Sequence, residues 1–438
     1  MFTDLARRQI NAAKELVAEL GRHLDISASV LLWDGTRCPL GRSAAAGGVT
    51  ICIAGPGVIA SLLRWPTLDR LIRHYAHGDL SIEGGTLIDL GEQLGDSGTR
   101  RRLKRANKLK LFRNLLPFLF ARAETPGASR RFAGKETGDV RVADDNRDFV
   151  QFHYDIGNDF YRLFLDPEMQ YSCAYFTEWT APLEVAQHAK LDIICRKLRL
   201  HQGERFLDIG CGWGGLICHA AQHYGVRAHG ITLSDEQAAV TRERIAAQGL
   251  EGRVTVEILD YAALTGQYDK IASIGMYEHI GVASIPRYFE TVRGLLSPDG
   301  LFLNHAISRR AKKKQTRFAK RPEQRALLKY IFPGGELDDI GHTVAAMEQA
   351  GFEVHDVDGW RQHYAQTTRL WCERLTVQRA DAVALVGEEK YRIWVAYLAA
   401  CSLAFQRGSA RIFQTLASKS AKGKPPLPPT RADLYRST

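Results

Sequence analysis

The chain has 438 residues, of which 45% are apolar and 25% are charged. This composition is ordinary for a globular protein, and the length suggests about two to three domains with enough chain to bury a sizeable core. The net charge of +10 at pH 7 makes nucleic acid and anionic lipid headgroups the candidate polyanionic partners.

Export and membrane insertion are not expected. The first 14 residues contain no apolar segment of the kind found in a secretory signal. Residues 47–63 are interrupted by Gly55-Pro56-Gly57, and residues 393–405 fall short of the ~20 residues of a spanning helix. We therefore expect a soluble, cytoplasmic protein with reduced thiols. The eight cysteines form no C-x-x-C motif and no paired His/Cys spacing, so no metal site is predicted.

Residues 1–125 are expected to form a small α+β accessory domain. Apolar spacing predicts helices over residues 5–24, 58–63 and 68–75. Strands are predicted over residues 49–53 and within YAHGDLSIEGG at residues 75–85. Residues 126–145 are rich in Gly, Ser, Asp and Arg and are interpreted as a linker.

Residues 146–420 alternate between strand and helix patterns, which predicts an α/β domain with a doubly wound sheet. Strands are expected over residues 205–209, 226–232, 254–259, 270–274 and 300–306, and helices over 183–198, 215–224, 234–248 and 285–296. Ligands of such sheets bind at the carboxyl ends of the strands. Residues 421–438 include KGKPPLPP and are expected to be a disordered tail.

The segment RFLDIGCGWGG at residues 205–215 is the most informative motif. Asp208 ends an apolar run, and Gly210, Gly212 and Gly214 follow at alternate positions. Glycines at this spacing turn a strand sharply into a helix and leave the backbone bare for a ligand. The spacing differs from the G-x-G-x-x-G of dinucleotide-binding folds and looks like the first motif of methyltransferases that use S-adenosylmethionine. A purely structural strand–turn–helix is the alternative.

Two later strand ends are candidate cofactor contacts. Thr232 and Leu233 end the second strand, and Gln237 follows at the capping-box position of Ser234, so a simple capped helix is the alternative. Asp260 and Tyr261 end the third strand, where a carboxylate could meet the adenine amine or the residues could form only a turn.

Five further motifs together resemble the cyclopropane fatty-acid synthase family. They are HYDIGNDFY at residues 153–161, MQYSCAYF at 169–176, GMYEHIG at 275–281, NHAI at 304–307 and YIFPGG at 330–335. The resemblance implies a Rossmann-like methyltransferase that transfers the methyl group of S-adenosylmethionine to the double bond of an unsaturated phospholipid acyl chain. It is strong from about residue 150 onward and weaker before that.

The resemblance also implies a site for a bicarbonate ion, which removes a proton from the added methyl group so that the cyclopropane ring closes. The ion's contacts map onto the side chains of Cys173, Glu278, His305 and Tyr364 and the backbone of Ile307. An anion beside a cationic sulfonium is electrostatically sensible. Tyr171 and Ser172, in the same motif as Cys173, map onto the cofactor site.

Each of these residues has an ordinary structural alternative. Cys173 could be a buried thiol, His305 a strand-end histidine with satisfied hydrogen bonds, and Tyr364 one residue of an amphipathic helix. The chain also has Asn304 and Ala306 where the family commonly has Leu and Thr. This departure lies beside the substrate, so a methyl- or methylene-branched acyl chain is the alternative product.

Two basic runs suggest contact with a lipid surface. Residues 100–113 and 309–321 each contain eight basic residues and no acidic ones. Apolar residues interleave with the first run, which predicts an interfacial amphipathic helix over residues 100–116; they are Leu103, Leu109, Phe112, Leu115 and Leu116. We expect peripheral association with the inner face of the membrane, and the resemblance suggests a homodimer. A nucleic-acid methyltransferase or binding protein is the alternative from a different class, although no aromatic-plus-basic motif supports it. A lipid carrier would leave the glycine turn unexplained.

Overall fold

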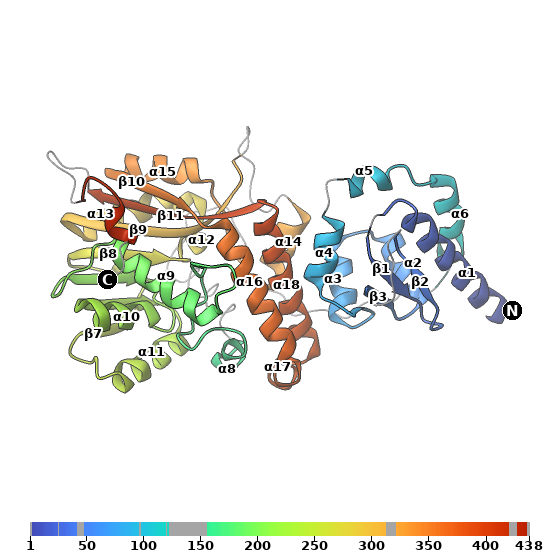
Figure 1. Ribbon diagram of the computed structural model, residues 1–438, viewed down its shortest axis with the longest axis horizontal. Helices are drawn as coiled ribbons and strands as arrows, with labels where there is room; N and C mark the ends of the chain where they lie inside the picture. Colours follow the sequence, from blue (N-terminus) through green and yellow to red (C-terminus); the bar gives the residue numbers. More distant parts are fainter. Residues whose placement is uncertain are drawn as a thin grey trace. The chain divides into compact units, whose positions relative to one another are not determined.

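The computed structural model describes residues 2–24, 26–41, 48–95, 98–119, 121, 156–311, 321–419 and 427–435. The chain divides into two compact units, each considered by itself below (Figure 1). The first unit comprises Met1–Arg131 with Val386–Leu403, and the second comprises Phe132–Leu385 with Ala404–Thr438. The predicted linker, residues 126–145, lies outside the described residues.

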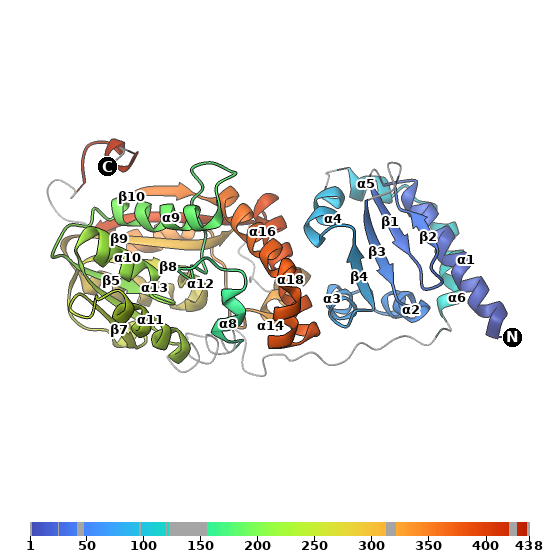
Figure 2. The same ribbon diagram turned by 60° about the horizontal axis from the view of Figure 1, so that its bottom comes forward.

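The first unit is built on a four-stranded sheet of order β2-β1-β3-β4, with β1 parallel to β3 and the other pairs antiparallel (Figure 2). Its strands are β1 Ala28–Leu31, β2 Arg37–Pro39, β3 Val49–Ile53 and β4 Leu80–Glu83. Its helices are α1 Phe2–Gly21, α2 Pro56–Arg64, α3 Leu68–Ala76, α4 Leu87–Leu94, α5 Thr99–Leu103 and α6 Lys108–Leu119. One hydrophobic cluster joins α1, α2, α6 and the sheet, with Val17 and Phe118 among its buried members.

A C-terminal segment also belongs to the first unit, which the sequence did not predict. Most of helix α18 (Glu388–Gln406) lies in it. Arg392 donates hydrogen bonds from Nε to the carbonyl oxygen of Tyr75 (2.5 Å) and from its terminal nitrogen to that of Leu80 (2.7 Å). The accessory unit is therefore completed by residues far along the chain.

The predicted interfacial helix over residues 100–116 is interrupted in the structure. Helices α5 and α6 replace it, separated by residues 104–107. The interruption has a local cause, because the Asn107 side chain accepts a hydrogen bond from the Lys110 backbone (3.1 Å) and starts a new helix. The Asn107 backbone in turn donates to Glu19 of α1 (2.9 Å).

The second unit contains the predicted doubly wound sheet, with strand order β10-β11-β9-β8-β5-β6-β7. The five strands from β9 to β7 are parallel, and β11 lies antiparallel between β9 and β10. The strands are β5 Arg205–Ile209, β6 Arg227–Thr232, β7 Val254–Ile258, β8 Tyr268–Ile274, β9 Leu296–Arg309, β10 Phe352–Gly359 and β11 Ala410–Lys419.

Helices cover both faces of this sheet (Figure 1). The helices of this unit are α8 Asn158–Arg162, α9 Leu183–Lys197, α10 Gly215–Tyr224, α11 Asp235–Ala247, α12 Tyr277–Ile280, α13 Ile285–Leu295, α14 Pro322–Tyr330, α15 Ile340–Gln349, α16 Arg361–Val377 and α17 Arg379–Val386, and those that pack on the sheet are α9 to α13 and α15. Successive side chains of β5 point to opposite faces of the sheet: Phe206 packs in the core with α9 and α10, and Leu207 packs in the core with α13. A strand buried on both faces reads as a continuous apolar run.

Of the predicted disordered tail, residues 421–438, the structure describes residues 427–435, and these are ordered. Residues 432–435 form a short 3₁₀ helix whose Leu434 is only 2% exposed. Arg199 pairs with Asp433 at 3.1 Å, and Arg196 donates to the Leu434 carbonyl oxygen at 3.3 Å. Burial of Leu434 and the contacts of Arg196 and Arg199 thus hold residues 427–435 in place, although the sequence around them is rich in proline. Among the described residues, no helix combines the length and apolarity needed to cross a bilayer.

Candidate active site

A pocket in the second unit opens where β5, β6, β7 and β8 end, on the edge of the sheet that the topology predicts. Ten of the predicted cofactor residues line it: Tyr171, Ser172, Asp208, Gly210, Gly212, Thr232, Leu233, Gln237, Asp260 and Tyr261. The strand ends therefore bring together residues that are 90 positions apart in the sequence (171 to 261). Gly214 is the predicted cofactor residue that does not line the pocket.

The glycines of the turn have two different roles. Gly212 has φ +56°, and a Cβ there would meet no atom of the described residues within 4 Å, so its bare backbone faces the open pocket. Gly214 has φ +80°, and a Cβ there would lie 2.5 Å from Cγ2 of Thr241. Gly214 is therefore required for the packing of α10 against α11 rather than for access to a ligand.

At the next two strand ends, the structure shows the cap and the turn that the sequence offered as structural alternatives, and the same residues line the pocket. Ser234 caps α11 by accepting from the Gln237 backbone (3.3 Å), and Thr232 donates to the Gln237 side chain (2.7 Å). Asp260 accepts from the Ala262 backbone at 2.8 Å and so forms a turn. These local bonds hold the side chains in place at the pocket wall.

Lys190, on α9, is a pocket residue that sequence reasoning missed. Its side chain is buried and donates to Oε1 of Gln170 (2.5 Å) and Oγ of Ser172 (3.0 Å). Burial lowers the pKa of Lys190 to about 8, against the opposing charge of Asp166. A lysine in a predicted helix gives no signal of burial, because most such lysines are solvated.

Asp208 lies across the same pocket as a buried carboxylate. Burial raises the pKa of Asp208 to about 7, and the charge of Lys190 opposes this shift. Its Oδ1 atom has no hydrogen-bond partner within the described part of the chain. A buried oxygen without a partner beside a cavity fits a ligand that brings a donor or a positive charge.

Glu278 and Ile307, two of the residues predicted to hold bicarbonate, are in direct contact. Glu278 lies in α12, just after β8. Its Oε1 atom accepts a hydrogen bond from the backbone N–H of Ile307 in β9 at 2.5 Å. Its Oε2 is buried and has no partner among the residues that the structure describes. Burial raises the pKa of Glu278 to about 7, and the bond from Ile307 moderates the shift.

His305, two residues earlier on β9, is fully buried and is oriented by a hydrogen-bonded chain. Lys197 donates to Oε1 of Gln414 (2.8 Å), so the amide nitrogen of Gln414 faces Nδ1 of His305 (3.0 Å). That nitrogen donates, which assigns the imidazole proton to Nε2. Nε2 has no partner in the described residues. Burial holds the pKa of His305 well below its usual range, so the ring is neutral.

Cys173 and His305 both contact Trp360, which the sequence did not single out. The Tyr364 ring stacks on Phe405, with centroids 4.5 Å apart. The Trp360 ring lies edge-on to the His305 ring, with centroids 5.3 Å apart. Its carbonyl oxygen lies 3.9 Å from the Cys173 sulfur and accepts from the Tyr364 backbone at 3.1 Å. Burial raises the pKa of Cys173, which describes an unreactive thiol rather than a nucleophile.

The glycine turn, the parallel sheet and the pocket at the strand ends define the class of S-adenosylmethionine-dependent methyltransferases. Residues 142–415 match the family described as mycolic acid cyclopropane synthetase, and the chain belongs to that family. It is therefore a methyltransferase of the cyclopropane synthase type, as the sequence motifs predicted.

Relatives in sequence and structure agree. The chain is 38% identical over 416 residues to a probable fatty acid methyltransferase of Pseudomonas putida, covering 94% of this chain and 97% of that protein. It is 38% identical over 270 residues to the cyclopropane-fatty-acyl-phospholipid synthase of Escherichia coli K12, covering 62% and 67%. The cyclopropane synthase MmaA2 of Mycobacterium tuberculosis has a TM-score of 0.59 at 34% identity, covering 62% and 98%. Mycolic acid cyclopropane synthase CmaA1, complexed with SAH and CTAB, gives the same values.

Proposed function

We propose that this protein methylates the double bond of an unsaturated phospholipid acyl chain and closes a cyclopropane ring on it. The observation that carries the proposal is two buried polar atoms that have no hydrogen-bond partner in the described part of the chain: Glu278 Oε2, just after β8, and His305 Nε2, on β9. The substrate class is supported by relatives named for fatty acids and for fatty-acyl phospholipids.

The pocket residues fit S-adenosylmethionine, which supplies an activated methyl group when bound. Gly212 leaves backbone accessible, and Asp208 offers a carboxylate oxygen that has no partner within the described chain. Asp260 and Tyr261 form the wall that we assign to the adenosine moiety. A structural relative of the same family was solved with SAH.

The polar pair fits a bicarbonate ion, which would supply the base for the last proton transfer. Such an ion has one O–H donor and several acceptor oxygens. His305 can donate from Nε2 to one oxygen, and Glu278 can accept the O–H at Oε2. We assign Cys173 and Tyr364 to the surroundings of the ion, where their burial excludes water and strengthens these hydrogen bonds.

A methyl- or methylene-branched acyl chain is the second candidate product. Asn304 and Ala306 flank His305, are both buried, and differ from the Leu and Thr common in the family. The Oδ1 atom of Asn304 has no partner among the described residues, so the polarity beside His305 is altered. A changed environment at this position could alter which proton is removed and hence the product.

We further propose that α6 holds the protein at an anionic phospholipid surface. Leu109 is 77% exposed and Phe112 60% exposed, and Leu116 and Leu119 continue the same helical face. Lys108 and Arg113 of α6 are exposed basic residues, and so are Lys104 and Arg105 just before the helix. Each cation near an anionic bilayer contributes about 1 kcal/mol. The second basic run falls mostly at residues 312–320, which lie outside the described residues.

The proposed reaction is tested with methyl-labelled S-adenosylmethionine and phosphatidylglycerol vesicles. We expect label in the lipid when the acyl chains are unsaturated and none when they are saturated. An equal transfer to both lipids, or transfer to neither, would contradict the proposal. Transfer to RNA instead would favour the nucleic-acid alternative.

A further inference from the structure

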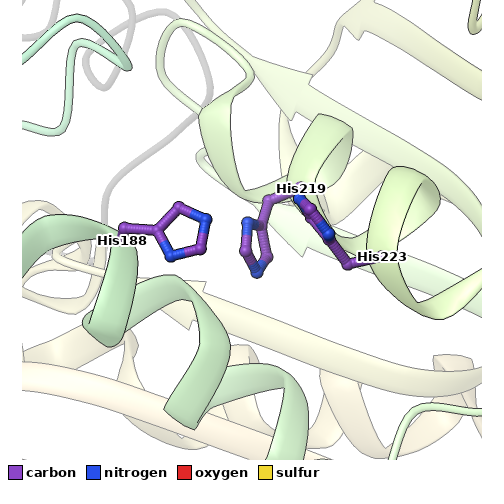
Figure 3. Close-up of side chains that lie close together, drawn as sticks. All are labelled: His188, His219 and His223. Atoms are coloured by element: carbon purple, nitrogen blue, oxygen red, sulfur yellow. The ribbon is translucent and has the colours of Figure 1, made fainter. Parts of the chain in front are cut away.

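Three histidines gather on the outer side of α9 and α10, the helices that pack together over one face of the large sheet. His188 lies on α9, and His219 and His223 lie one turn apart on α10. Figure 3 shows the ring of His219 between the other two, with side chains converging from both helices. The cluster belongs to neither the cofactor pocket nor the Glu278–His305 pair.

The three rings have the spacing of a metal-binding group. One ligating nitrogen from each lies within 4.8 Å of the others. Ring centroids are 4.9 Å apart for His188 and His219, 4.5 Å for His219 and His223, and 5.8 Å for His188 and His223. Tetrahedral coordination at the usual zinc–nitrogen length needs nitrogens about 3.3 Å apart. His188 and His223 are exposed, so their side chains can rotate inward to this spacing.

His219 supplies the second, independent observation. It is buried, and its Nε2 atom has no hydrogen-bond partner within the described residues. Burial, with His223 and His188 nearby, lowers the pKa of His219 to about 3, so the ring stays neutral at physiological pH. A neutral imidazole with an unused nitrogen is ready to coordinate a metal.

We propose that His188, His219 and His223 bind a transition-metal ion such as Zn²⁺ or Ni²⁺, which joins α9 to α10. Imidazole ligands favour these ions over hard cations such as Mg²⁺. Three protein nitrogens leave at least one coordination position for water. Asp192, one turn beyond His188, accepts from Tyr224 (2.5 Å) and pairs with Arg196 (2.7 Å), so its charge lies nearby but is already engaged.

The site has a structural consequence for the enzyme. α9 carries Lys190 and α10 begins at the glycine turn, so both helices contribute to the cofactor pocket. An ion that holds the helices together binds only the folded state and therefore raises the melting temperature. The sequence contains a signal for this site, since His219 and His223 are four residues apart on a predicted helix.

The test is calorimetric titration of the full chain, without a polyhistidine tag and with its thiols kept reduced, with Zn²⁺ and then Mg²⁺. We expect one Zn²⁺ per chain, a higher melting temperature with Zn²⁺, and no comparable response to Mg²⁺. His188→Gln and His223→Gln change exposed side chains and should each weaken Zn²⁺ binding at least tenfold. The control His201→Gln changes an exposed histidine outside the cluster and should leave binding unchanged.

Two results would overturn the proposal. One is an absence of stoichiometric Zn²⁺ binding by the folded parent protein. The other is equal affinity in the parent and in both cluster variants, which would place the ion elsewhere, for example on cysteines. Methyl transfer is not the readout, so a failure of this site and a failure of the proposed reaction are distinguishable.

Discussion

At the scale of single residues, the proposed chemistry depends on a carboxyl group that burial makes costly. Burial raises the pKa of Glu278 from its usual 4.5 to about 7. Between pH 4.5 and pH 7, the Glu278 carboxyl group is therefore protonated in the folded state and ionised in the unfolded state. The stability that this proton contributes is present at low pH and is lost as the pH rises through 7.

Glu278→Gln should separate function from stability. We expect turnover to fall at least about 100-fold, because the amide oxygen would bond to the Ile307 backbone and the amide nitrogen in place of Oε2 cannot accept the O–H of the ion, while cofactor affinity is retained. The parent should lose stability between pH 5 and pH 8 as Glu278 ionises in the folded state, whereas Gln does not ionise. The free energy of unfolding of the variant, relative to that of the parent, should therefore rise by up to about 3 kcal/mol over this range. Denaturant unfolding at the two pH values measures this difference. Normal turnover would remove Glu278 from the proposed site.

Gln414→Glu tests the tautomer of His305. A carboxylate would accept from Nδ1, moving the imidazole proton away from Nε2. We expect at least a tenfold loss of turnover with cofactor affinity unchanged, and an altered ¹⁵N signal from the ring. Gln414→Met offers no acceptor for Nδ1 and should lose less activity. Equal activity of both variants would show that the tautomer does not matter.

At the scale of elements, the glycine turn joins two functions that substitution can separate. Gly214→Ala should destabilise the protein by about 2–4 kcal/mol, because a left-handed φ and the contact with Thr241 act together. Gly212→Ala meets no neighbouring atom, so it should cost only about 1–2 kcal/mol and mainly weaken cofactor binding. Denaturant unfolding and cofactor titration of both variants measure these two effects. A larger loss of stability in Gly212→Ala than in Gly214→Ala would contradict the assignment.

Helix α6 should control attachment to lipid without altering chemistry. Replacing Leu109 and Phe112 with Ser removes exposed apolar groups, so the fold should lose little stability. We expect a smaller fraction of the protein to sediment with phosphatidylglycerol vesicles and a lower rate of methylation of the vesicle lipid. The affinity for the cofactor should be unchanged. The control variant replaces two exposed apolar residues outside α6, Val377 and Leu385, with Ser and should bind vesicles as the parent does. Unchanged vesicle binding would contradict the role of α6.

The elements that the sequence predicts well have a strong local signal. Strand 205–209 and helix 215–224 are confirmed at the same residues because an apolar run, a glycine turn and a second apolar run bound them sharply. Strands β10 and β11 were not predicted, because β11 lies antiparallel between β9 and β10 and depends on partners distant in sequence. The break between α5 and α6 has a local signal in the Asn107 cap, to which the bond from the Asn107 backbone to Glu19 of α1 adds a contact distant in sequence.

At the scale of the whole molecule, the candidate site combines residues of two kinds. Those carried by motifs, such as Asp208 and His305, could be named from the sequence. Lys190, Trp360 and Gln414 could not, because their importance comes from burial and from contacts made only in the folded chain. The expected homodimer stays a prediction.

The central claim is that the chain closes a cyclopropane ring on an unsaturated lipid. The most direct test is proton NMR of lipid recovered after incubation of the purified protein with S-adenosylmethionine, bicarbonate and unsaturated phosphatidylglycerol vesicles. The account predicts ring-methylene signals upfield of ordinary methylenes, at the expense of olefinic protons, and their loss in Glu278→Gln. A methylated product that shows only branch methyl or exocyclic methylene signals, with no ring protons, would contradict it.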